Sequence, residues 1–138
     1  MSGAVATSPD IIISSTPQGG GSLGDPSGLA FDSRGNLWIA NASLNTLVMF
    51  GAGQLGESGT PTPSVVIGGS LGGPSGLAFD AAGNLWVSNS GSAILRFAAG
   101  QLTSSGTPDA GVALTGVLGI GLGLLAFNPA PIGLPLAR

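Results

Sequence analysis

The sequence predicts an all-β fold made of about three repeating units. The first sign is a motif at residues 26–41 (PSGLAFDSRGNLWIAN) that returns at 74–89 (PSGLAFDAAGNLWVSN). A third copy that keeps only part of the motif begins at residue 124, and Phe31, Phe79 and Phe127 lie 48 residues apart. The second sign is composition, because 26 glycines and 10 prolines suit short strands joined by tight turns. A strand-rich repeat of this length is typical of solenoids, arrays or propellers.

Each complete repeat is expected to hold four strands. They are predicted at 28–31, 37–40, 46–50 and 64–67 in the first repeat, and at 76–79, 85–88, 93–97 and 111–114 in the second. A lone strand at 10–13 comes before them, and the third repeat supplies only two strands, near 123–127 and 133–137. Four short antiparallel strands, repeated, predict β-propeller blades, about three in this chain. The whole chain, 1–138, is therefore predicted to be one domain with repeats at about 10–63, 64–110 and 111–138, the last incomplete.

Large and small side chains alternate along the predicted strands of the second repeat. Leu77 and Phe79 are expected on one face of the sheet and Ala78 on the other. In the next strand, Leu85 and Trp86 are likewise expected on opposite faces. This pattern indicates sheets that stack face to face with both sides covered.

A recurring turn is predicted between the first two strands of each repeat. An aspartate that caps its own backbone and a glycine that supplies a positive φ are the usual residues of such a turn. The turn residues are Asp32, Gly35 and Asn36 in the first repeat and Asp80, Gly83 and Asn84 in the second. Because a residue that recurs once per repeat at a turn serves the turn, we interpret these six as structural. Asn41 and Asn89, which end the second strand, are expected to tie down the loop that follows.

The motif P-x-G-L-A-F-D-x-x-G-N-L-W-V-x-N resembles the NHL-type repeat, found in β-propellers of usually six blades. The resemblance is carried by Pro26, Gly28, Asp32, Gly35, Asn36, Trp38 and Asn41, and by Pro74, Gly76, Asp80, Gly83, Asn84, Trp86 and Asn89. It covers almost the whole chain and implies a fold rather than an activity, since such propellers host enzymes and binding proteins alike. The connection AAGQLTSSGTP is similar to those of exported bacterial proteins of this kind, which implies a secreted or periplasmic setting.

The chain departs from that family by holding about three repeats instead of six. Three blades cannot close a ring, and an open arc leaves an apolar face bare at each end. We therefore expect a homodimer that forms one six-bladed ring, in which the lone strand 10–13 completes the partner's final strand pair. The alternative is that the chain is a fragment of a longer propeller protein.

Composition excludes several classes of function. With three Lys and Arg against six Asp and Glu, the net charge is −3 and no basic stripe could bind nucleic acid. The absence of cysteine excludes a disulfide framework and a thiolate zinc site. The start, MSGAVATSPD, does not read as a signal peptide. The uncharged stretch 110–127 is long enough to span a bilayer, but five glycines interrupt it, so no membrane span is expected.

The predicted function is a non-catalytic scaffold without a cofactor, which binds a ligand or a protein partner and associates with itself. The alternative is half of a metal-dependent lactonase-like or lyase-like enzyme that holds its metal through Asp and Asn oxygens. The chain has no histidine, and its single glutamate, Glu57, stands in a Gly-Ser loop, so no catalytic constellation is visible. Trp38 and Trp86 are predicted to pack between blades, or to bind a sugar or peptide if they reach an exposed surface.

Overall fold

The computed structural model describes residues 8–15, 22–90 and 93–115 and forms two four-stranded antiparallel sheets. The first sheet has the order β1-β2-β3-β4 and the second β5-β6-β7-β8. Their strands are β1 (Pro26–Phe31), β2 (Leu37–Asn41), β3 (Thr46–Phe50), β4 (Val65–Ile67), β5 (Pro74–Phe79), β6 (Leu85–Asn89), β7 (Ala93–Phe97) and β8 (Val112–Thr115). The prediction of an all-β fold with two complete four-stranded repeats is confirmed, with strand ends shifted by one or two residues.

The two sheets are built alike in every strand pair. In each, the first strand pairs with the second in a register that shifts after the proline, between Pro26 and Gly28 in one sheet and Pro74 and Gly76 in the other. A short 3₁₀ turn follows the third strand of each sheet, η1 (Ala52–Gln54) and η2 (Ala99–Leu102). This equivalence means that one sequence motif folds the same way twice.

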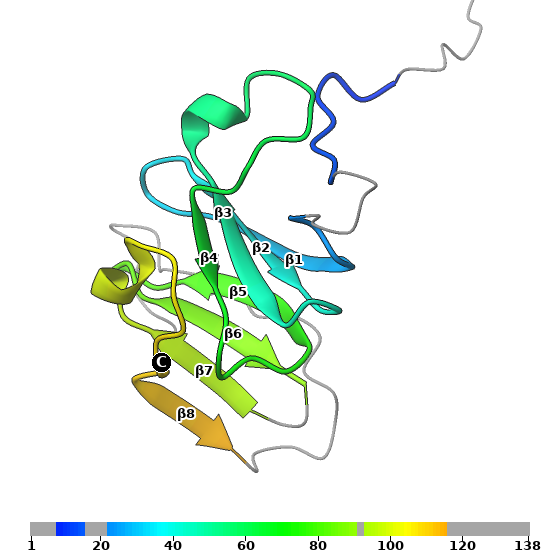
Figure 1. Cartoon of the computed structure of the whole chain (residues 1–138). Coiled ribbons are helices and arrows are strands. Elements are labelled where there is room, and N and C mark those ends of the chain that lie inside the picture. Colours follow the sequence, from blue (N-terminus) through cyan, green and yellow to red (C-terminus); the bar gives the residue numbers. More distant parts are fainter. Residues whose placement is uncertain (1–7, 16–21, 91–92, 116–138) are drawn as a thin grey trace, which may run out of the picture.

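The sheets lie face to face, with β1 beside β5 (Figure 1). The first sheet packs on the second through the face that carries Trp38, Ala40 and Leu47. The second sheet packs on the first through its other face, not the one equivalent to the Trp38 face. That face carries Leu77, Leu85, Val87, Leu95 and Phe97, and Phe79 packs against the shared core. Apolar burial between unlike faces of equivalent sheets therefore holds the repeats together.

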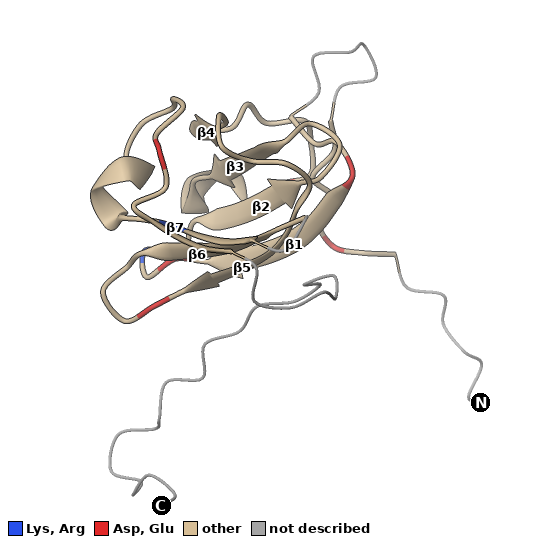
Figure 2. Ribbon diagram, turned by 90° about the horizontal axis from the view of Figure 1, so that it is seen from below, with Lys and Arg blue, Asp and Glu red and all other residues tan. Residues whose placement is uncertain are grey.

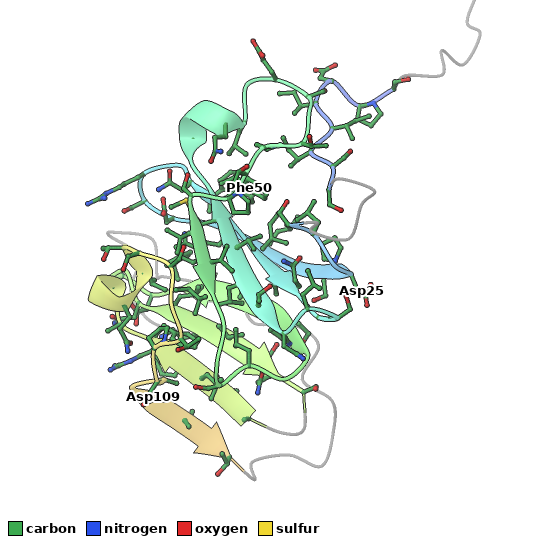
Figure 3. The ribbon with its side chains drawn as sticks, viewed as in Figure 1. Asp25, Phe50 and Asp109 are labelled. Carbon is green, nitrogen blue, oxygen red and sulfur yellow. The ribbon has the colours of Figure 1, made fainter. Side chains whose placement is uncertain are left out.

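A second, smaller core lies on the far side of the first sheet. Ile39, Val48 and Phe50 form it, and Phe50 (labelled in Figure 3) is fully buried at the end of β3. Ile13, Leu23 and Leu55 pack against this cluster from outside the sheet.

The N-terminal segment differs from its prediction as a strand. Residues 10–13 form no ladder, and Ile13 makes one isolated parallel bridge with Gly59. The β-branched sequence favours an extended backbone, but a strand also needs a neighbouring strand to accept its hydrogen bonds. The two strands predicted in the third repeat, near 123–127 and 133–137, lie outside the described residues.

Candidate binding site between the two Asp-Gly-Asn turns

The turn between β1 and β2 is organised by the side chain of Asp32. Its Oδ1 accepts the backbone N–H groups of Arg34 at 2.9 Å and Asn36 at 3.0 Å, and its carbonyl oxygen accepts the N–H of Gly35. Gly35 has a φ of +82°, a conformation that glycine adopts without a steric penalty. The second turn repeats these bonds, with Asp80 Oδ1 accepting from Ala82 and Asn84 and Gly83 at a φ of +83°.

The second carboxylate oxygen of each aspartate receives donors from side chains. Asp32 Oδ2 accepts Asn36 Nδ2 at 2.9 Å and the indole Nε1 of Trp38 at 3.2 Å. In the second repeat, Asp80 Oδ2 accepts Asn84 Nδ2 at 3.0 Å and Trp86 Nε1 at 2.9 Å. Each turn is thus locked to the following strand through a tryptophan six residues on.

Sequence reasoning missed this link between aspartate and tryptophan. Its signal was present, because the six-residue spacing of Asp32 and Trp38 recurs at Asp80 and Trp86. A buried indole N–H needs an acceptor, so the nearest recurring carboxylate was a candidate.

The asparagines of the turns reach onward to the 3₁₀ turns. Asn36 Oδ1 accepts the N–H of Ala52 at 3.0 Å, and Asn84 Oδ1 accepts the N–H of Ala99 at 3.2 Å. Aspartate, asparagine and tryptophan therefore tie three segments of each repeat to one another.

These hydrogen bonds lower the pKa of both carboxyl groups. For Asp80 the indole of Trp86, then the side chain of Asn84 and two backbone N–H groups, lower the pKa from 3.8 to about 2. For Asp32, partial burial raises the pKa, but the bonds from Asn36, Trp38 and Arg34 together outweigh it and leave the pKa below 3.8. Donors that favour the ionised form cause both shifts, so both aspartates are charged at neutral pH.

A hollow of about 440 Å³ lies between the two turns. Residues of the Asp32 and Asp80 turns, of both sheets and of the η2 turn line it. Among the lining residues are Asp32, Arg34, Trp38, Phe79, Asp80 and Leu102. Its size is within the range of small-ligand pockets, and its lining combines charged and apolar side chains.

The carboxylates that face this hollow do not fit a metal ion. Each accepts four hydrogen bonds from its own repeat, which is the capacity of a carboxylate. A cation would have to displace these donors before it could coordinate the oxygens. Within the described part of the chain, no group of three His, Cys, Asp or Glu residues could hold a metal ion.

The two tryptophans occupy different surroundings. Trp38 is 1% exposed and lies between the sheets, so its ring face cannot stack on a ligand, although its edge reaches the hollow. Trp86 lies on the outer face of the second sheet, where the Arg96 guanidinium carbon stands 5.9 Å from its ring centroid. The same motif position therefore faces a neighbouring sheet in one repeat and an arginine in the other.

The asparagines at the end of the second strand mainly secure the loop before the first strand of their sheet, and not, as predicted, the loop that follows them. Asn41 Oδ1 accepts the N–H of Gly24, and its Nδ2 donates to the carbonyl of Ser22 at 2.8 Å. Asn89 Oδ1 accepts the N–H of Gly72 at 2.8 Å. Among the described residues, the bond from Asn41 Nδ2 to Thr46 Oγ1, at 3.3 Å, is the one that reaches the loop after the second strand.

Charged groups are few on the described surface, and they are scattered (Figure 2). Glu57 is exposed in the loop after η1, away from the Asp32 and Asp80 turns. Among the residues that the structure describes, no helix is long and apolar enough to cross a membrane, and most of 110–127 lies outside them.

Comparison with known proteins adds no assignment. No protein-family model matches the chain, and no curated protein matches it.

Proposed function

We propose that the chain is a non-catalytic β-propeller repeat scaffold of the NHL type. In this proposal it binds a ligand or a protein segment in the hollow between the Asp32 and Asp80 turns, and it associates with itself to complete the propeller. The repeated stacking of equivalent four-stranded sheets supports the propeller architecture, because blades pack on one another in this way.

One observation carries the binding role. The hollow is formed jointly by two consecutive repeats, and its aspartates are already saturated by donors of the turns. A carboxylate of low pKa whose oxygens already accept four hydrogen bonds serves poorly as a general base or metal ligand. Its hydrogen bonds instead keep the turn that lines the hollow rigid. No specific observation favours the lactonase-like or lyase-like alternative.

The experiment uses the two indole N–H signals in the NMR spectrum of the ¹⁵N-labelled chain. Trp38 lines the hollow, whereas Trp86 is linked to it only through its bond to Asp80 Oδ2, so a molecule bound in the hollow should affect the first signal more than the second. The probes are a panel of mono- and disaccharides, a mixed tripeptide library, and the chlorides of calcium, magnesium and zinc.

A saccharide or peptide that binds in the hollow should move the Trp38 signal in a saturable way, and by more than it moves the Trp86 signal. The metal chlorides should move neither. If no organic probe moves the Trp38 signal, the binding role of the hollow is wrong. If a metal moves it at equimolar concentration, the enzymatic alternative replaces the proposal.

A further inference from the structure

The contact between the two repeats includes a short parallel bridge that links β4 to the loop after η2. The N–H of Val66 donates to Ser105 Oγ at 2.9 Å, and the N–H of Gly106 donates to the Val66 carbonyl at 3.0 Å. The N–H of Gly68 then donates to the carbonyl of Gly106 at 2.9 Å. These three bonds attach the outer strand of the first sheet to the repeat that follows it.

The N-terminal segment makes the same three bonds to the first repeat. The N–H of Ile12 donates to Ser58 Oγ at 2.9 Å, and the N–H of Gly59 donates to the Ile12 carbonyl at 2.9 Å. The N–H of Ser14 then donates to the carbonyl of Gly59 at 2.8 Å. Ile12 therefore makes to the first repeat the bonds that Val66 makes to the second. Val66 belongs to the outer strand of the sheet that precedes the second repeat, so Ile12 stands where the outer strand of a sheet preceding the first repeat would lie.

That preceding sheet has no inner strands among the described residues. β4 pairs along its length with β3, whereas the segment 10–13 pairs with no strand. Ile11 and Ile12 are 41% and 51% exposed, as expected for an outer strand whose neighbour is missing.

The first sheet also lacks the cover that a preceding sheet would give it. Leu29 and Phe31 are each 63% exposed, whereas their counterparts in the second repeat, Leu77 and Phe79, pack against the Trp38 face of the first sheet. The segment 10–13 already packs on the neighbouring part of this uncovered face, through Ile13. The place of a preceding sheet is thus marked twice, by an outer strand and by an apolar face.

We propose that a second copy of this chain fills this place with its third repeat, so that the segment 10–13 becomes the outer strand of the partner's blade. This rests on the propeller architecture proposed above. The second sheet of a partner does not fit, because its own outer strand, β8, would compete with residues 10–13. The third repeat has the Leu-Ala-Phe of a first strand at 125–127, and a second strand is expected at 133–137. In the proposed blade residues 10–13 lie beside this second strand, as the outermost of three strands. In the proposed propeller the third repeat does not reach this place from within its own chain, because rings of fewer than four blades do not close.

The test measures mass by light scattering behind size exclusion, at tens of micromolar, for the full chain and two variants. The first variant is the double substitution Leu29→Lys with Phe31→Lys, and its control is Leu44→Lys. Leu44 is a 47% exposed leucine in the β2–β3 loop, outside strand β1, which carries Leu29 and Phe31. The natural chain and the control should have twice the 13.2 kDa of one chain, and the double variant should have the mass of one chain.

A second measurement does not depend on the folding of the double variant. The chain contains no cysteine, so Leu29→Cys and Leu44→Cys each accept one benzophenone maleimide at a known site. Photolysis should join the Leu29→Cys label to a peptide from residues 116–138 of a second chain, and mixing with ¹⁵N-labelled chain shows that the link is between copies. The Leu44→Cys label should give no such product.

The outcomes separate this inference from the proposed function. If the natural chain has twice the mass and the double variant keeps it, or the Leu29→Cys label joins other residues, this docking is wrong while self-association stands. If the natural chain is a single copy, self-association and this docking are both wrong, and ligand binding at the hollow is judged by the Trp38 signal alone.

Discussion

The ring of Phe79 meets the ring of Trp38 edge to face, with the ring centroids 6.1 Å apart and the planes at 66°. Phe79 belongs to β5 of the second sheet and Trp38 to β2 of the first, so this contact joins the two repeats. Both residues also line the hollow between the turns. Two residues that pack the repeats together therefore also line the candidate binding site.

Phe79→Ala should lower the free energy of unfolding by about 2 kcal/mol, because a half-buried aromatic contact is lost and a cavity is left. The matched control is Phe31→Ala at the equivalent position of the first repeat, where the side chain is 63% exposed. In dilute solution this control should cost less than about 0.5 kcal/mol. Urea unfolding measures both, and equal losses would show that the Trp38 contact contributes nothing special.

Gly28→Ala should lower the free energy of unfolding by about 2 kcal/mol, because the new Cβ would overlap the carbonyl oxygen of Ser75. β1 and β5 are in close contact here, and Ser27 Oγ donates to the carbonyl of Pro74 at 2.9 Å. The control is Gly53→Ala in η1, where nothing lies within 4 Å of the added atom. Thermal denaturation of both variants is the measurement, and an unchanged Gly28→Ala midpoint would contradict this close approach.

Arg34→Ala should leave the stability within about 0.5 kcal/mol of the natural chain, because alanine already stands at the equivalent position, Ala82. The backbone N–H of residue 34 still donates to Asp32. Gly35→Ala, one residue on, should cost about 1 kcal/mol because the φ of +82° strains any residue with a Cβ. Chemical denaturation compares the pair, and a larger loss for Arg34→Ala would mean that its side chain holds the turn.

Trp86→Phe should raise the pKa of Asp80 from about 2 toward 3.8, because the indole N–H is the main donor that favours the ionised carboxylate. The pKa of Asp32 should not move, because its indole donor is Trp38. Titration of the carboxyl ¹³C signals measures both groups in one sample. A pKa of Asp80 that stays near its original value would show that the Asn84 and backbone donors suffice.

The stability of the folded chain should fall in acid, between about pH 4 and pH 2. The pKa of Asp32 and of Asp80 is lower in the folded chain than the ordinary 3.8, so the unfolded chain binds more protons in this range. The stabilisation from both carboxylates is complete above the unfolded pKa and is lost as the pH falls through the folded values. Urea midpoints from pH 6 to pH 2 measure the fall.

The control for the acid transition is Asp80→Asn, which removes one of the two lowered groups. Its stability at neutral pH should be lower, and its dependence on pH between 4 and 2 should be weaker. If the natural chain and Asp80→Asn show the same slope in this range, the Asp80 turn is not responsible for the acid sensitivity.

The sequence by itself determined the secondary structure of both complete repeats and the chemistry of their turns. Alternating side chains fix which face of a strand is apolar, and an aspartate with a glycine three residues on fixes a tight turn. These are local relations, so two nearly identical motifs could be expected to give two nearly identical sheets. The segment 10–13, predicted as a lone strand, makes an isolated bridge and no ladder among the described residues, because pairing requires a neighbouring strand that its own sequence does not supply.

Only the tertiary structure decided which unlike faces meet, what lies between the turns and what each tryptophan contacts. Trp38 and Trp86 share one motif position, yet the first is enclosed by Phe79 of the next sheet and the second lies against Arg96. Local sequence cannot distinguish them, because burial depends on residues that lie far away along the chain. The hollow arises in the same way, since neither the Asp32 turn nor the Asp80 turn forms it without the other.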